Sequence, residues 1–213
     1  MKDVKKMRND LLSQRVIKAL KKRNMEAYYV HTKEEALKKA LDIIPKGSSV
    51  SWGGATSALE IGLLKKISES GDYKVFNRDN AKTPEEVRDI YLQSFDCDFY
   101  LGGINAMTED GILVNVDGNS NRVAAYAYGP KYVLLIASMD KVVSTLDGAI
   151  ERARTIASPI NAQRFGLKTP CATAGSCGDC THLECICSNI MITRFSRADK
   201  RIKIILVNEK LGF

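Results

Sequence analysis

The stretch SVSWGGATSALE, residues 49–60, places a short alternating run, two glycines and a helix start in direct succession. The run Ser49–Trp52 is bounded by turn residues, and its length and alternation favour a β-strand. Gly53 and Gly54 permit a tight turn after it. The hydroxyls of Thr56 and Ser57 stand where a helix would begin, and they could cap it. The stretch therefore predicts a strand, a turn and a helix, which is the first half of a βαβ unit.

The same order of strand and helix repeats along the chain. Thr32 and Thr83 each open a capping-box pattern, Pro84 suits a first helical position, and Thr145 opens a weaker cap. Strands that alternate with helices form βαβ units. We therefore predict an α/β fold with a largely parallel sheet flanked by helices. The other predicted strands are Ala27–Val30, Tyr73–Phe76, Asp98–Leu101, Val133–Ala137, Asn189–Phe195 and Ile202–Val207.

The composition is that of a globular protein. The 213 residues are 45% hydrophobic and 27% charged, and this length suggests one domain, with or without an appended module. We expect a single domain over residues 1–213. No run approaches the roughly 18 apolar residues of a membrane span, and the N-terminus lacks the apolar segment of a secretory signal. We therefore expect a cytoplasmic protein without a membrane span.

Basic residues are concentrated before residue 24 and contribute to a formal net charge of +7. They alternate at helical spacing with apolar residues such as Leu12, Val16 and Leu20, which is typical of an amphipathic helix with a solvated face. Binding to nucleic acid or to a membrane surface is the alternative, but the segment lacks interleaved aromatic residues and any recognised motif. We do not expect a nucleic-acid partner. The basic balance suits an anionic small-molecule ligand.

Five of the six cysteines fall within the 17 residues from Cys171 to Cys187. Thiolates bind zinc and iron–sulfur clusters, and the two-residue spacing of Cys177 and Cys180 lets both sulfurs reach one centre. In a reducing compartment such a cluster indicates a metal site rather than a disulfide frame. A redox dithiol, or reactive thiols without a metal, is the alternative. We expect residues 158–190 to be a cysteine-rich insertion on the α/β body that a bound metal orders.

The glycine-rich turn after the strand Ser49–Trp52 is a candidate anion site. Backbone N–H groups and the positive end of a helix dipole favour a phosphate or a carboxylate at such a turn. The alternative is a tight turn with a hydroxyl cap and no ligand. The candidate ligand-binding residues are Gly53, Gly54, Ala55, Thr56 and Ser57.

A second polar stretch, residues 102–122, follows the predicted strand Asp98–Leu101. Its carboxylates lie near glycine turns and are candidates for acid–base work, and its asparagines and arginine are candidates for holding an anion. Ordinary turn chemistry is the alternative for each single residue. Since ligands gather at the carboxyl ends of parallel strands, we expect this stretch to share one cleft with the glycine turn. The catalytic candidates are Glu109, Asp110 and Asp117, and the ligand-binding candidates are Asn105, Asn119, Asn121 and Arg122.

These motifs together resemble the lactate-utilisation (LUD) domain family in its short stand-alone form. The resemblance runs from about Ser51 to the end of the chain, and it is specific because several motifs match in the same order. The motifs are NAMTEDG at 105–111, LVNVDG at 113–118, NRVAA at 121–125, YGPK at 128–131, ASPINA at 157–162, TPC at 169–171, the cysteines that follow, and ILVNEKLGF at 205–213.

The resemblance implies a fold like that of ribose-phosphate isomerases and CoA transferases, in which a glycine loop after an early strand holds phosphate. It also implies a metal centre. The family pattern has an arginine in place of Cys185, which marks Cys185 as the spare thiol, although this residue could substitute for Cys187. The implied ligands, for an iron–sulfur cluster or zinc, are Cys171, Cys177, Cys180 and Cys187.

Two functions follow from the motifs and the resemblance. The first is a redox-associated accessory protein of lactate or related organic-acid utilisation, with an anion-binding cleft, a cysteine metal centre and iron–sulfur redox partner proteins. The alternative is an enzyme or sensor that acts on a phosphorylated or CoA-linked small molecule and carries a structural zinc. Whether the chain is an enzyme therefore depends on which of the two holds. A nucleic-acid-binding module is a third and weaker possibility.

Overall fold

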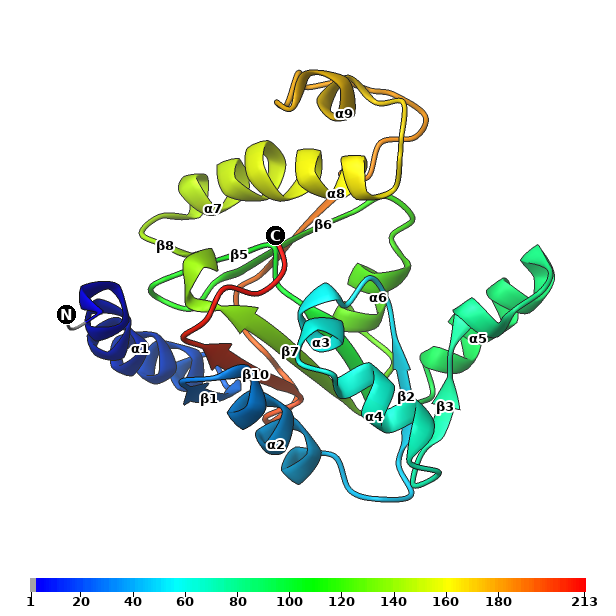
Figure 1. The fold of residues 1–213 in the computed structure, drawn as a ribbon, viewed down its shortest axis with the longest axis horizontal. Helices are drawn as coiled ribbons and strands as arrows, with labels where there is room; N and C mark the ends of the chain where they lie inside the picture. The colour runs from blue at the N-terminus through cyan, green and yellow to red at the C-terminus, as the bar shows by residue number, and fades with distance from the viewer. Residues whose placement is uncertain (1–2) are drawn as a thin grey trace.

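The structure is a computed structural model that describes residues 3–213. Its centre is a six-stranded, all-parallel sheet in the order β1-β10-β7-β4-β2-β3 (Figure 1). The six strands coincide with six predicted runs, so the predicted α/β fold with a parallel sheet flanked by helices is confirmed. They are β1 (Glu26–Val30), β2 (Ser49–Trp52), β3 (Lys74–Phe76), β4 (Phe99–Gly103), β7 (Tyr132–Ser138) and β10 (Ile202–Val207).

Helices cover both faces of this sheet. Two of these helices begin at predicted caps. The Thr32 hydroxyl accepts the N–H of Glu35, and the Thr83 hydroxyl accepts the N–H of Glu86, both at 3.2 Å. Glu35 also binds back across the cap, where its carboxylate accepts the N–H of His31, the residue before the N-cap, at 2.7 Å. The helices around the main sheet are α1 (Val4–Lys22), α2 (Lys33–Ile43), α3 (Thr56–Glu60), α4 (Leu63–Glu69), α5 (Pro84–Ser94) and α6 (Asn121–Ala127).

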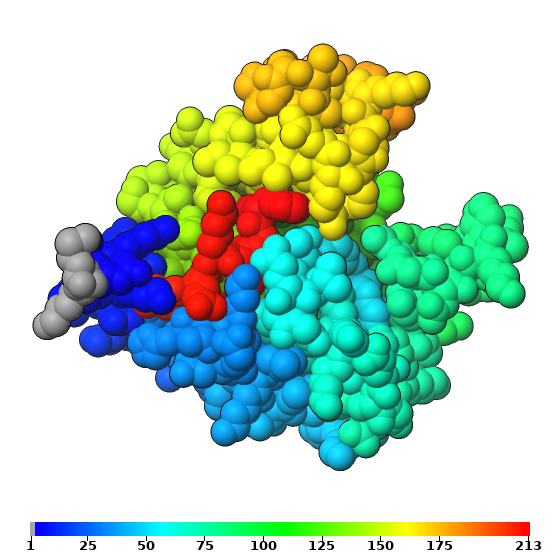
Figure 2. Space-filling model, in the orientation of Figure 1, coloured from blue at the N-terminus to red at the C-terminus, as the bar shows by residue number. Residues whose placement is uncertain are grey.

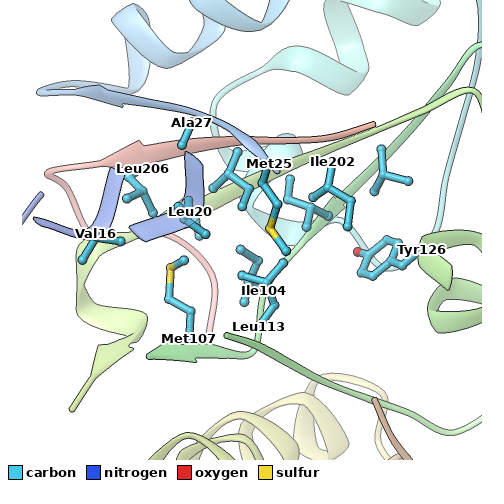
Figure 3. Packing of buried hydrophobic residues seen from close by; sticks show 14 of the residues in the cluster. Val16, Leu20, Met25, Ala27, Ile104, Met107, Leu113, Tyr126, Ile202 and Leu206 are labelled. Carbon is cyan, nitrogen blue, oxygen red and sulfur yellow. The ribbon is translucent and has the colours of Figure 1, made fainter. Parts of the chain in front are cut away.

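The two faces of the sheet bury two separate apolar clusters, because successive side chains of a strand point to opposite faces. Leu134 and Ile136 of β7 pack on the face covered by α2, α3 and α4. Leu135 packs on the other face, where Leu20 of α1 and Met107 also lie (Figure 3). Both faces are therefore largely apolar, as expected of a parallel sheet buried between layers.

A second, smaller sheet has the order β8-β5-β6-β9. The predicted strand at 189–195 belongs here, and it pairs antiparallel with β6. Helix α7 packs on this sheet through Ala149, and the π-helical turn Ala153–Ala157, which joins α7 to α8, packs on it through Ala153. The elements are β5 (Ala106–Thr108), β6 (Leu113–Asp117), β8 (Val142–Val143), β9 (Asn189–Thr193), α7 (Leu146–Arg152) and α8 (Ser158–Arg164).

The cysteine-rich segment projects from the body beyond α8 (Figures 1 and 2). Its first part, Ser158–Arg164, is a helix of the body whose residues Pro159 and Ala162 are buried. The projecting part that follows contains one short helix, α9 (Pro170–Ala174), and returns to the body at β9. Within residues 3–213, no helix has both the length and the apolar character needed to cross a membrane.

Candidate functional site

Two adjoining cavities lie at the carboxyl edge of the main sheet, where the segments after β2, β4 and β7 meet. The outer cleft has a volume of about 460 Å³, and the inner chamber has a volume of about 30 Å³. Gly54, Arg122 and Asn161 line both, so the chamber opens from the cleft. The chamber is also lined by Thr56, Ser57, Gly103, Ile104, Asn105, Lys141, Gly212 and Phe213.

The predicted shared cleft is therefore present in its main parts. Gly54, Thr56 and Ser57 of the glycine turn face Asn105 and Arg122 of the polar stretch across the inner chamber. The outer cleft adds Asn119 and Asn121, together with residues that the sequence did not indicate. Those residues include Arg78, Asn161, Arg164 and part of the cysteine segment, Leu183–Ile186.

Arg122 is held between the two cavities by the start of α6. The Asp117 carboxylate Oδ2 accepts the backbone N–H of Arg122 at 2.9 Å and of Val123 at 3.1 Å, which fixes the first turn of the helix. The guanidinium Nη2 donates to the carbonyl oxygen of Val116. The Nε atom is buried without a hydrogen-bond partner and lies 3.9 Å from Asp117 Oδ2. A buried cation with a free N–H is a group that an anion would satisfy.

Asn105 links this arginine to the second sheet. Its Oδ1 accepts the Val116 N–H at 3.1 Å and Arg122 Nη2 at 3.4 Å. Its own N–H donates to Asn115 Oδ1 at 3.4 Å, and the Nδ2 of that asparagine is buried without a partner. The carboxamide network therefore orients the arginine, and it leaves two buried N–H-bearing atoms, Asn115 Nδ2 and Arg122 Nε, without a hydrogen-bond partner.

Lys141 is a second cation in the chamber, and the sequence did not single it out. It ends the 3₁₀ turn Met139–Lys141 that follows β7, and only 4% of the residue is exposed. No carboxylate of residues 3–213 lies within ion-pair distance of its Nζ. Burial, and then the positive charges of Arg152 and Arg122, lower its pKa to about 7, against an opposing effect of Glu60.

The charges around the two cavities favour an anionic ligand. Arg164 of α8 and Arg78, which begins the turn after β3, join Arg122 in the outer cleft. Burial, followed by the positive charges of Arg122 and Arg78, lowers the pKa of Arg164. Among the residues that line the inner chamber there is no side-chain carboxylate. The outer cleft is also lined by the carboxylates of Asp117 and Glu184, but its three arginines leave an excess of positive charge, which favours ligands of the opposite sign.

Comparison with known proteins assigns the chain to a family. A family model described as LUD domain matches residues 13–207. The chain belongs to the LUD domain family. The resemblance predicted from the sequence motifs is thus confirmed, and the site described above lies within a LUD domain. A search of curated proteins found no match.

Solved structures show that the fold is shared. The LUD domain aligns with the crystal structure of a DUF162 family protein from Deinococcus radiodurans, with a TM-score of 0.54 and 13% identity over 93% of this chain and 98% of that chain. Ribose 5-phosphate isomerase from Plasmodium falciparum aligns over 53% of this chain and 52% of its own, with a TM-score of 0.32 and 12% identity. At such identity the first likeness concerns the fold alone.

The glycine turn of the LUD domain differs in detail from the prediction. The N-cap of α3 is Ala55, and neither Thr56 nor Ser57 caps the helix, because both already lie inside it. Gly53 does not line the cavities. A Cβ atom there would lie 2.5 Å from the Tyr100 hydroxyl, so this glycine is required for packing. Ala55 is buried in the apolar cluster rather than facing a ligand.

Two of the three catalytic candidates lie outside the cleft of this LUD domain. Glu109 forms an ion pair with Arg15, and Asp110 forms one with Arg23 at 2.5 Å. Both arginines belong to or adjoin α1, so these carboxylates fasten the β5–β6 turn to the first helix. The prediction that Glu109 and Asp110 share the cleft with Arg122 is therefore wrong. Of the three candidates, Asp117 alone lines the cleft, and its carboxylate accepts a backbone N–H of the first turn of α6.

The cysteines of the LUD domain are close in sequence but are not assembled around one point. Within residues 3–213 no three Cys, His, Asp or Glu side chains are grouped so as to hold a metal ion. The shortest approach of two sulfurs, 3.3 Å, joins Cys185 to Cys187. Burial, and then Cys185, raises the pKa of Cys187 to about 12. Cys177 lies 3.7 Å from Arg154 Nη2. The thiol donors suit zinc or an iron–sulfur cluster, but coordination by all four predicted ligands requires this segment to rearrange.

Proposed function

We propose that this LUD domain binds a small organic anion, a carboxylate or phosphate, where the inner chamber meets the outer cleft, with one anion oxygen in the chamber between Arg122 and Lys141. Membership of the LUD domain family supports a role related to lactate utilisation. We propose further that the protein acts in lactate or related organic-acid utilisation as a redox-associated accessory protein. One observation carries the anion site: a buried cation, Lys141, and a half-buried one, Arg122, line a chamber that has no side-chain carboxylate among its lining residues.

Burying a charge in the folded protein costs free energy. A cation removed from water destabilises the folded state unless a counter-charge or hydrogen bonds compensate it. Arg122 has a buried Nε without a partner, and Lys141 is buried without an ion pair among the described residues. An anion in the chamber would accept hydrogen bonds from both groups at once. Bonds to charged donors contribute about 1.5–3 kcal/mol each, which suffices for useful affinity.

The outer cleft supports the second candidate function, an enzyme or sensor that acts on a phosphorylated or CoA-linked small molecule. Its volume of about 460 Å³ exceeds what a three-carbon acid needs and falls within the usual range of ligand sites. Arg78 and Arg164 stand in this cleft beyond Arg122. A ligand with a second anionic group would use them, whereas lactate would not reach them.

Calorimetric titration distinguishes these candidates. We expect lactate and inorganic phosphate to bind at one site per chain, and to compete with each other. Ribose 5-phosphate and CoA test the outer cleft, and a substantially tighter interaction with either favours the second function. If none of the four ligands binds to the wild-type protein, the anion site is refuted.

Replacing Ser57 by alanine is expected to weaken anion binding about two- to tenfold, because one neutral hydroxyl donor is lost from the chamber. The side chain is 2% exposed and faces the same cavity as Lys141. The measurement is the dissociation constant for phosphate or lactate. Ser68→Ala, on the exposed surface of α4, is the matched control and should bind like the wild type. Equal affinity of Ser57→Ala and the control would remove Ser57 from the site.

We also propose that the cysteine segment binds a metal through Cys171, Cys177, Cys180 and Cys187. Anaerobic purification followed by metal and sulfide analysis should find either an iron–sulfur cluster, which favours the redox role, or zinc, which favours the second function. Cys185→Arg should keep the metal, and Cys180→Ser should lose it. Loss of metal in Cys185→Arg would show that the spare thiol is misassigned, and full reactivity of all five thiols in metal-replete protein would refute the site.

A further inference from the structure

Lys141 occupies a position that an ordinary structural lysine does not. Only 4% of Lys141 is exposed, and its Nζ makes no ion pair within residues 3–213. A buried amine without a counter-charge loses its proton readily and then carries a free electron pair. Surface lysines, by contrast, remain charged and solvated. Lys141 can therefore donate a hydrogen bond to an anion when it is protonated and act as a nucleophile when it is neutral.

The surroundings of the amine are fixed by packing. A Cβ atom built on Gly212 would lie 3.0 Å from Lys141 Nζ and 2.9 Å from Ser57 Oγ, so these two polar atoms converge on the same point beside the C-terminal segment. Figure 2 shows the C-terminal residues lodged between the parts of the chain coloured cyan and yellow. The amine and a hydroxyl thus share the wall of a chamber with the volume of about one water-sized group.

Arg122 stands at the boundary of this chamber and the outer cleft. A ligand whose anionic group binds to this guanidinium has its next one or two atoms directed either outward or toward Lys141. Only a small planar group fits in the chamber, and a carbonyl group meets that requirement. Binding of the anion would hold the carbonyl carbon near the amine and raise the effective concentration of the two reactants.

We propose that Lys141 forms an imine with the carbonyl group of an anionic aldehyde or ketone, such as a 2-oxo acid or a sugar phosphate, that Arg122 holds. This inference rests on the proposed anion site and names its ligand class. The neutral Nζ adds its electron pair to the carbonyl carbon, and the π pair moves to the oxygen, which takes a proton. The resulting carbinolamine loses water when nitrogen gives up a proton, so the products are an imine and one water molecule. No oxidant or reductant is needed.

The charged groups around the amine set its protonation state. Arg152 and Arg122 disfavour the charged ammonium, and Glu60 opposes them. The carboxylate of Glu60 already accepts the backbone N–H of Gly212 at 3.1 Å. Burial and the two arginines outweigh Glu60 and lower the pKa of Lys141 to about 7, so a substantial fraction of the amine is neutral near pH 7, where a free lysine is almost fully charged.

The test is reductive trapping. The full-length protein is incubated with pyruvate or with ribose 5-phosphate, borohydride is added, and the modified residue is mapped by peptide mass spectrometry. We expect an adduct on Lys141 whose mass increase equals that of the carbonyl compound less one oxygen atom. The adduct should be absent from Lys141→Met and should be suppressed by lactate, which has the same anionic group but no carbonyl. The exposed Lys66 is the internal control for nonspecific modification.

Calorimetry on the same preparation separates the two possible failures. If pyruvate and lactate bind but Lys141 is modified no more than Lys66, the imine is refuted and the anion site stands. If neither anion binds and no adduct forms, both proposals are refuted. Trapping that persists on other lysines of Lys141→Met to the same extent would equally refute the inference.

Discussion

Replacing Lys141 by methionine is expected to stabilise the ligand-free protein by roughly 2–4 kcal/mol at pH 7. Burial is the first cause that lowers the pKa of this lysine to about 7, and the nearby arginines add to it. In the unfolded chain the amine has an ordinary pKa near 10.4 and stays protonated at neutral pH. Folding therefore costs the free energy of deprotonating or burying it. Methionine keeps most of the apolar stem and removes this cost.

The pH dependence gives the sign of the effect. Below about pH 7 the cost of Lys141 is fully present, because both states of the wild type are protonated and the folded one is disfavoured. Between pH 7 and about 10 the unfolded state binds more protons, so the wild type gains stability as the pH rises. The advantage of Lys141→Met should thus shrink to about 1 kcal/mol by pH 9.5. Urea unfolding at pH 7 and 9.5 measures it.

Lys66→Met is the matched control, because this lysine is exposed on α4 and makes no ion pair among the described residues. Its stability should differ from the wild type by less than about 0.5 kcal/mol at either pH. If Lys141→Met is instead less stable than the wild type at pH 7, the amine makes favourable contacts in the folded state. Its role as a buried, uncompensated cation would then be wrong.

Replacing Arg122 by alanine is expected to weaken the binding of phosphate or lactate by about 1.5–3 kcal/mol, or roughly 10- to 150-fold. The guanidinium lines both cavities and has a buried Nε without a partner. Arg122→Lys should recover only part of the affinity, because a point charge replaces a planar fork of donors. Titration calorimetry measures the dissociation constants. Arg88→Ala, on the exposed face of α5, should bind like the wild type.

Stability must be measured alongside affinity for this variant. Removing Arg122 also leaves the Asp117 carboxylate, which is only 11% exposed, without the cation 3.9 Å away. Some loss of stability is therefore expected and would not by itself explain weaker binding if the circular dichroism spectrum is unchanged. Unaltered affinity in a folded Arg122→Ala protein would contradict the account.

The main sheet was predictable because each of its strands is a short apolar run between turn residues. Strands buried on both faces carry that signal even without strict alternation, as Val133–Ala137 shows. The second sheet was harder to predict. Its strands β5 and β8 are only 3 and 2 residues long, and polar residues flank both in the sequence. Such strands are defined by their partners rather than by their own sequence.

The cleft was predicted in outline because loops after parallel strands meet at one edge. Glu109 and Asp110 were misplaced because β5 and β6 form an antiparallel pair that carries the turn between them to α1. Asp110-Gly111, a common hairpin dipeptide, was a weak signal for this placement. Lys141 was missed for a different reason. Its position shortly after Val133–Ala137 suggested the sheet edge, but its burial depends on the C-terminal segment, which packs there only in the folded chain.

The most direct test of the anion site is a crystal structure of the protein with lactate, and one with phosphate. We expect density for the anion where the inner chamber meets the outer cleft, with an oxygen within hydrogen-bond distance of Arg122 and of Lys141. Density only elsewhere on the protein, or an empty chamber at a ligand concentration that saturates the calorimetric site, would contradict it.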